Sequence, residues 1–98
     1  MKYRKKPVIV EAMQWDGTEM SGGVIEEWAK GDGETYIVEL LKPYLSEVIA
    51  GTGKLRLVTP TLEGYLDASP NDFIIRGVAG EFYPRKPDIF AATYEAVE

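Results

Sequence analysis

The chain has 98 residues, of which 45% are hydrophobic, 11% aromatic and 28% charged, a size and balance typical of one globular domain with a single core. It contains neither cysteine nor histidine, which excludes disulfides, zinc fingers, thiolate nucleophiles and every mechanism that needs an imidazole base or ligand. The net charge of −5 disfavours duplex nucleic acid as a partner, because affinity for phosphate backbones comes mainly from basic surface.

The N-terminal segment is basic, since four of the eleven basic residues are Lys2, Arg4, Lys5 and Lys6. A nucleic-acid or membrane arm is one interpretation, but the charge pattern favours a solvated segment ahead of the first strand. No apolar run approaches the roughly 20 residues of a membrane span, and the basic start lacks the apolar segment of a secretory signal. We therefore expect a cytoplasmic chain without membrane association.

The first expected elements are a strand and a helix. Residues 8–15 are rich in β-branched and apolar side chains and end at the Asp16-Gly17 turn, which predicts a strand in the centre of the sheet. Ser21 is a suitable cap for a helix whose apolar residues recur at helical spacing over positions 23–30.

Residues 35–50 are ambiguous, because their apolar side chains follow a helical pattern on both sides of Pro43. An interior proline costs a helix about 3 kcal/mol. We therefore expect a strand over residues 35–41, followed by a short helix with Pro43 in its first turn and Gly51 just beyond its end. One kinked helix is the alternative.

The second half of the chain has the alternation typical of strands. Residues 54–58 and 65–68 predict one hairpin around a turn at positions 61–64. Residues 69–72 have the composition of a tight turn, because proline suits its second position and asparagine tolerates its third.

A second hairpin is expected from residues 73–78 and 81–83, which flank an Ala-Gly pair. Asp88 then suits the cap of a single helical turn, and residues 92–97 predict a last strand.

These elements predict an α+β domain in which a mainly antiparallel curved sheet or small open barrel carries one or two short helices. The first strand is expected to be central, with the helix over positions 23–30 packed against it. Because the sequence has no internal repeat or interdomain linker, we expect residues 1–98 to form a single domain. Its aromatic residues and edge strands also predict self-association as a dimer.

Four stretches of the sequence carry a resemblance: YRKKPVIVEA at 3–12, SPNDFIIRG at 69–77, GEFYPRKPDIF at 80–90 and TYE at 93–95. In these stretches the chain resembles a group of small bacteriophage and prophage proteins, most of which have no assigned function. A related family is named for a Pro-Gly-Asp-Tyr-Gly motif, of which this chain keeps Pro70 and Asp72. The resemblance implies an intracellular accessory protein of phage type.

The candidate cluster consists of six residues within positions 76–88, around the second predicted hairpin: Arg76, Glu81, Tyr83, Arg85, Lys86 and Asp88. Basic side chains beside an aromatic ring suit a phosphate or carboxylate together with a stacked base. A solvated network of surface ion pairs is the alternative. Within this cluster Arg76 is the foremost candidate for binding the ligand. It shares a face with Ile74 in strict alternation, so a partly buried side chain would need an anionic partner.

Other features are weaker candidates. Trp15 and Trp28 are more typical of core or interface packing than of ligand binding. Glu26 and Glu27 diverge on a helix and do not make a catalytic carboxylate pair. The Gly-Thr-Gly-Lys stretch at 51–54 lacks the Gly-Lys-Ser/Thr ending of a phosphate loop.

Three classes of function follow. The first, which we favour, is a non-enzymatic protein that sequesters a small anionic ligand, such as a nucleotide signal used in host antiviral defence. The second is a protein–protein adaptor, a host-factor inhibitor or a minor virion component. The third is a small enzyme with carboxylates and a divalent cation, which no spacing in the sequence supports. We expect no catalytic residue, metal site or cofactor.

Overall fold

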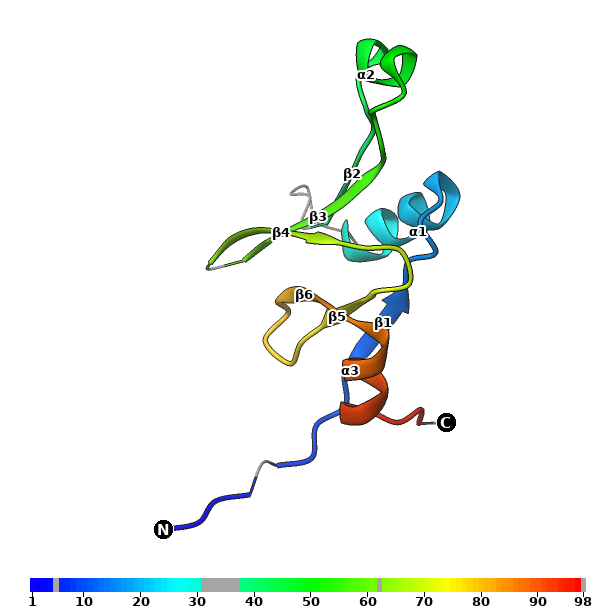
Figure 1. Ribbon diagram of the computed structural model, residues 1–98. Coiled ribbons are helices and arrows are strands. Elements are labelled where there is room, and N and C mark those ends of the chain that lie inside the picture. The colour runs from blue at the N-terminus through cyan, green and yellow to red at the C-terminus, as the bar shows by residue number, and fades with distance from the viewer. Residues whose placement is uncertain (5, 31–37, 62, 98) are drawn as a thin grey trace.

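The computed structural model describes residues 1–4, 6–30, 38–61 and 63–97 and confirms the expected α+β class (Figure 1). Over this part of the chain all strand pairs are antiparallel, and neither sheet closes into a barrel. The elements in chain order are β1 (Glu11–Gln14), α1 (Glu19–Lys30), β2 (Glu39–Leu41), α2 (Leu45–Ala50), β3 (Arg56–Thr61), β4 (Gly64–Ala68), β5 (Phe73–Arg76), β6 (Phe82–Arg85) and α3 (Pro87–Thr93).

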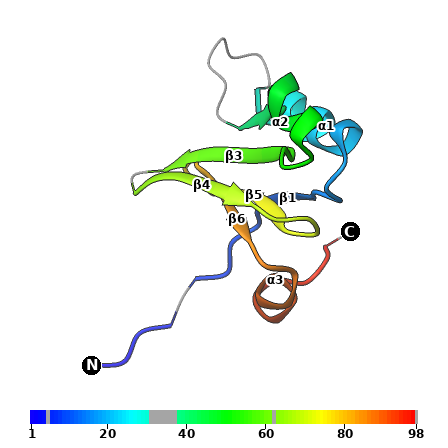
Figure 2. The ribbon, with the colours of Figure 1, turned by 45° about the horizontal axis from the view of Figure 1, so that its top comes forward.

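Two three-stranded sheets form the body of the molecule. One has the order β1-β5-β6 and the other the order β2-β3-β4, and β6 lies against β3 and β4 (Figure 2). The buried core takes side chains from α1 and from both sheets, including Ile25, Leu57, Ile74 and Phe82. The hydrophobic effect therefore joins the two sheets through this shared core.

The first strand is shorter than predicted and lies at an edge of its sheet, so its predicted central position is wrong. The pairing with β5 runs from Glu11 opposite Arg76 to Gln14 opposite Phe73. Gly77 begins the next turn, so β5 ends before it. Residues 8–10 therefore have no strand partner among the described residues. The helix α1 also departs from the prediction, because it packs mainly on β2.

The helix α1 begins earlier than predicted and is capped by Thr18. Its Oγ1 accepts the backbone N–H of Ser21 at 3.1 Å, which is the bond that an N-cap residue makes. Asp16 Oδ1 accepts both the backbone N–H and the hydroxyl of Thr18, and these bonds lower the pKa of Asp16. Ser21, the predicted cap, lies in the first turn instead.

A strand followed by a helix, rather than one kinked helix, occupies residues 38–50. The predicted strand positions 35–37 lie outside the described residues. Pro43 precedes the helix instead of lying in its first turn, because Tyr44 is the N-cap and its N–H donates to Glu47 Oε2 at 2.9 Å. Gly51 ends the helix as predicted, in the left-handed conformation with φ of 75°.

Both predicted hairpins and the tight turn between them are confirmed. The first hairpin reverses between Thr61 and Gly64. In the tight turn the N–H of Asp72 donates to Ser69 O at 3.0 Å, and Asn71 has a φ of 77°. These features are those of a turn with proline second and asparagine third.

The predicted last strand is wrong, because residues 87–93 form the helix α3. Phe90 stacks on Phe73 with ring centroids 3.9 Å apart, and Tyr94 lies 5.1 Å from Phe90. Phe90 and Tyr94 are four positions apart, so the helix brings their rings within about one turn of each other, whereas an extended chain would hold them roughly 13 Å apart. Asp88 lies in the first turn, and the N-cap is Lys86.

The molecule is elongated, with extents of 57 × 31 × 30 Å and a radius of gyration of 15.2 Å, against about 13 Å for a compact domain of 100 residues. The N-terminal segment and α2 project at opposite ends (Figure 1). Among the described residues, no helix combines the length and apolar character needed to cross a bilayer.

Candidate functional site

The six residues of the candidate cluster lie in separate places. In the β5–β6 hairpin Arg76 is opposite Phe82, while Ile75 is opposite Tyr83 and Phe73 is opposite Arg85. Directly opposed residues share a face of a sheet, and successive residues alternate between faces. The side chain of Arg76 therefore lies on one face of the sheet, and those of Tyr83 and Arg85 lie on the other.

Arg76 is held by other parts of the chain. Its guanidinium carbon lies 4.7 Å from the ring centroid of Trp28 and 5.2 Å from that of Phe82. Nη2 donates to Trp28 O at 2.8 Å, and Nη1 lies 3.3 Å from Glu11 Oε2. Trp28 O belongs to the last turn of α1, where carbonyl groups lack helical partners and a positive charge is favourable. Arg76 thus caps α1 and fixes it to the sheet.

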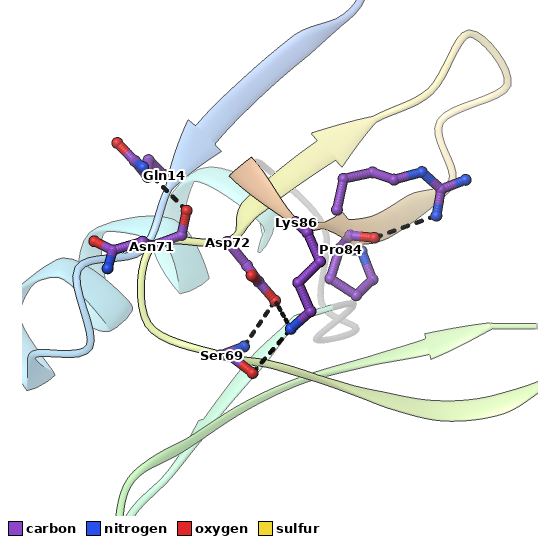
Figure 3. Close-up of polar contacts among 7 residues, drawn as sticks. Gln14, Ser69, Asn71, Asp72, Pro84 and Lys86 are labelled. Atoms are coloured by element: carbon purple, nitrogen blue, oxygen red, sulfur yellow. Dashed lines mark hydrogen bonds and ion pairs between the residues drawn. The ribbon is translucent and has the colours of Figure 1, made fainter. Parts of the chain in front are cut away.

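Lys86 is also paired within the chain (Figure 3). Its Nζ lies 3.2 Å from Asp72 Oδ2 and 3.1 Å from Ser69 Oγ. Asp72 is only 3% exposed, and the same carboxylate oxygen accepts the N–H of Ser69 at 2.9 Å. Because a buried carboxylate needs a counter-charge, Lys86 binds the turn at residues 69–72 to the start of α3.

Glu81 and Asp88 have different surroundings. Glu81 Oε2 accepts the N–H of Ala79 at 3.0 Å, and the carboxylate lies over Gly77, where any Cβ would overlap it. Glu81 therefore holds the turn of its own hairpin. Asp88 is exposed in the first turn of α3.

Glu81, Tyr83 and Arg85 line an open cleft of about 540 Å³ between β6 and the end of the β3–β4 hairpin. We call it the β6 cleft, and it is lined by Pro60, Thr61, Glu63, Leu66, Glu81, Phe82, Tyr83 and Arg85. Its β3–β4 half was not predicted from the sequence. Those residues have no motif, and only the packing of two hairpins that are distant in sequence brings them to β6.

The positive charge of the β6 cleft belongs to Arg85. Its guanidinium carbon lies 5.0 Å from the ring centroid of Tyr83, and Nη1 donates to Pro84 O at 3.4 Å. Among the residues that the structure describes, no carboxylate lies within ion-pair distance of Arg85. Arg76 and Lys86 both have such a carboxylate, so Arg85 is the basic residue of the candidate cluster that is left to bind an anion.

The hydroxyl of Tyr83 is shielded. It lies 3.4 Å from the hydroxyl of Tyr94, and burial together with this neighbour raises the pKa of Tyr83 to about 12. The phenol is therefore neutral at physiological pH. It offers the cleft an aromatic ring rather than a base.

We expect Tyr83→Phe to reduce the loss of stability at alkaline pH. Between pH 10, the ordinary pKa, and about 12, the pKa of folded Tyr83, the folded chain binds more protons than the unfolded chain. Stability then falls as the pH rises. Urea denaturation across this pH range is expected to show a smaller decrease in the free energy of unfolding for Tyr83→Phe than for the wild type. Tyr65→Phe, at an exposed tyrosine, is the control, and an equal decline in both variants would contradict the expectation.

A second hollow of about 550 Å³ lies between α1 and β2. We call it the α1–β2 groove, and it is lined by Glu19, Met20, Gly23, Glu26, Leu40 and Lys42. It has no aromatic ring, and its Lys42 is paired with Glu19, which also raises the pKa of Lys42. The β6 cleft is therefore the better candidate for binding a small anion with a ring.

Comparison of the chain with protein-family models, curated proteins and solved structures finds no match.

Proposed function

We propose that the chain is a non-enzymatic binding protein whose β6 cleft takes a small ligand with a flat ring and a negatively charged group. The observation that carries this proposal is Arg85, a guanidinium without a carboxylate partner among the described residues, which stacks over Tyr83 at the wall of a cleft. A guanidinium in this position has donors for a phosphate or carboxylate.

The dimensions and lining of the β6 cleft restrict the ligand. A volume of about 540 Å³ lies within the range of small-molecule sites, and Pro60, Leu66 and Phe82 contribute apolar surface. Glu63 and Glu81 place two carboxylates at the same cleft, which repel a highly charged ligand. A nucleotide derivative with one negative charge, such as a cyclic phosphodiester, therefore fits better than a triphosphate.

Binding without turnover agrees with the chemistry of the residues. The chain has no histidine or cysteine, so an imidazole base and a thiolate nucleophile are both missing. Tyr83, the aromatic residue beside Arg85, has a raised pKa and is a poor base at neutral pH. The resemblance to phage proteins favours a role in the bacterial cytoplasm, where the protein would sequester a nucleotide signal of host defence.

Calorimetric titration with cyclic mononucleotides, cyclic dinucleotides and linear triphosphates tests the proposal. We expect singly charged phosphodiesters to bind best, and Arg85→Ala to weaken binding by about 1–3 kcal/mol, roughly 5–150-fold, as for loss of a hydrogen bond to a charged group. Arg56→Ala is the matched control, because Arg56 is exposed, paired with Asp67 and outside the β6 cleft. It is expected to bind like the wild type.

Chromatography of the recovered ligand separates binding from catalysis. Unchanged ligand supports sequestration, whereas a cleaved product would move the protein to the enzyme class. If no member of the panel binds, the proposal fails and the adaptor hypothesis, tested by pull-down from host lysate, takes its place.

A further inference from the structure

The strand β1 has a free edge, because among the described residues it pairs only with β5. The N–H of Trp15 donates to Asp72 O beside β5. Backbone groups alternate between the two edges of a strand, so the odd-numbered residues of β1 face β5, whereas Ala12 and Gln14 point to the free edge. The β5–β6 pairing agrees, because Pro84, which has no N–H to donate, lies opposite a β5 residue whose backbone faces β1.

Residues 8–10 extend the free edge without a strand partner among the described residues. They lead away from the body of the molecule (Figure 1), and Val8 and Ile9 are 43% and 78% exposed. All three are β-branched residues, which are typical of strands. Continued through this segment, the same alternation gives the free edge four outward-facing residues: Val8, Val10, Ala12 and Gln14.

The proline of this segment leaves the free edge intact. Pro7 has no N–H to donate, and proline is a common way to block an edge strand. Its odd-numbered position, however, directs its backbone to the side of β5, and the pairing with β5 ends at Glu11. The missing N–H therefore leaves no gap in the free edge.

The charges favour a second copy of the chain as the added strand. No acidic residue precedes Glu11, whereas four of the eleven basic residues occupy the first six positions. Among the described residues, exposed Arg4 has no carboxylate within ion-pair distance, and Asp16 has no basic side chain there. Hydrogen bonds from Thr18 lower the pKa of Asp16, which is therefore ionised at neutral pH. In an antiparallel pair of copies, each Arg4 approaches the Asp16 of the other, and the two attract.

We propose that the free edges of β1 from two copies pair antiparallel about a two-fold axis at Val10, which joins two three-stranded sheets into one. In this register Val8 lies opposite Ala12 of the second copy, and Arg4 lies opposite Asp16. The hydrogen-bonded pairs, all at even-numbered residues, supply about ten backbone hydrogen bonds, as many as a typical interface has. The β6 cleft stays open, because β6 lies at the other edge of its sheet.

Neighbouring registers are less favourable. A two-fold axis at Glu11 puts two carboxylates directly opposite each other, in a pair whose side chains are close and repel. With the axis at Val10, Glu11 lies opposite Ile9 instead and keeps its ion pair with Arg76. An axis at Ala12 pairs apolar with polar side chains and shortens the ladder. The register about Val10 therefore fits the sequence best.

Proline substitutions at two adjacent residues test the free edge. Val10→Pro removes an N–H that points to the second copy, whereas Ile9→Pro removes one that points to the other side. Neither N–H has a backbone partner among the described residues. In sedimentation equilibrium at tens of micromolar, we expect the wild type and Ile9→Pro to have twice the 10.9 kDa of one chain. Val10→Pro is expected to be a monomer with an unchanged circular dichroism spectrum. A monomeric wild type, or two proline variants of the same mass, would overturn the proposal.

Lysine substitutions at the same two positions test the register. Val10→Lys puts two lysines directly opposite each other in the dimer, whereas Ile9→Lys puts each lysine opposite Glu11 of the second copy. Both variants add the same charge, so a difference between them reports the cross-strand neighbours. We expect the dimer Kd to rise about tenfold for Val10→Lys and to stay within about threefold of the wild type for Ile9→Lys. A Val10→Lys chain that dimerises like the wild type would show that the axis does not lie at Val10 and would refute the proposal.

Discussion

Replacing Asp72 by alanine is expected to lower the free energy of unfolding by about 2–4 kcal/mol, since hydrogen bonds to a charged group each contribute roughly 1.5–3 kcal/mol. The buried carboxylate accepts the N–H of Ser69 and faces Lys86, and its backbone N–H closes the turn. Alanine leaves the N–H of Ser69 without this partner and releases Lys86 from the turn. Urea denaturation followed by circular dichroism measures the change.

Asp67→Ala is the matched control for Asp72→Ala. Asp67 pairs with Arg56 on the surface, where both side chains are about half exposed, and exposed pairs contribute about 0–1 kcal/mol. We therefore expect a much smaller change than for Asp72. Equal decreases in the free energy of unfolding would contradict this expectation, because they would show that burial does not raise the contribution of Asp72 to stability.

Replacing Arg76 by alanine is expected to lower the free energy of unfolding by about 2–3 kcal/mol. The guanidinium lies against two aromatic rings and donates to the last turn of α1, so its loss loosens the helix from the sheet. For a domain of this size each 1 kcal/mol shifts Tm by about 4–8 °C. Thermal denaturation measures this shift, and ligand affinity of the folded Arg76→Ala chain is expected to match the wild type.

Two further variants separate the roles of the Arg76 side chain. Glu11→Gln removes only the exposed partner of the ion pair and is expected to change stability by less than about 1 kcal/mol. Arg76→Lys keeps the charge but loses the planar guanidinium, and we expect an intermediate loss. If Arg76→Ala abolished ligand binding without lowering Tm, Arg76 would belong to the binding site after all.

Local features of the fold were predictable from the sequence, and features that depend on tertiary packing were not. Pro70 and Asn71 determine their turn by their own backbone preferences. The extent of β1 depends on where β5 ends. Residues 92–97 have the composition of a strand, but α3 includes Phe90 and ends just before Tyr94. The rings of these two residues pack against the sheet. Here tertiary contacts override local propensity.

The candidate site shows the same division. Glu81, Tyr83 and Arg85 were identified because a hairpin keeps residues that are close in sequence together. The grouping of Arg76 with them depends on the register, which the sequence does not specify: a shift of one residue would put Arg76 on the face of Tyr83. Leu66 and Pro60 reach the β6 cleft through packing between hairpins, for which the sequence has no local signal.

The most direct test of the binding proposal is a map of backbone amide shifts in ¹⁵N-labelled protein titrated with cyclic adenosine monophosphate, a singly charged phosphodiester. We expect the largest shifts at the amides of Glu63, Leu66, Tyr83 and Arg85, which surround the β6 cleft, and small shifts around Arg76. Saturable shifts confined to Arg76 and α1, or no shifts for any ligand of the calorimetric panel, would contradict the proposal.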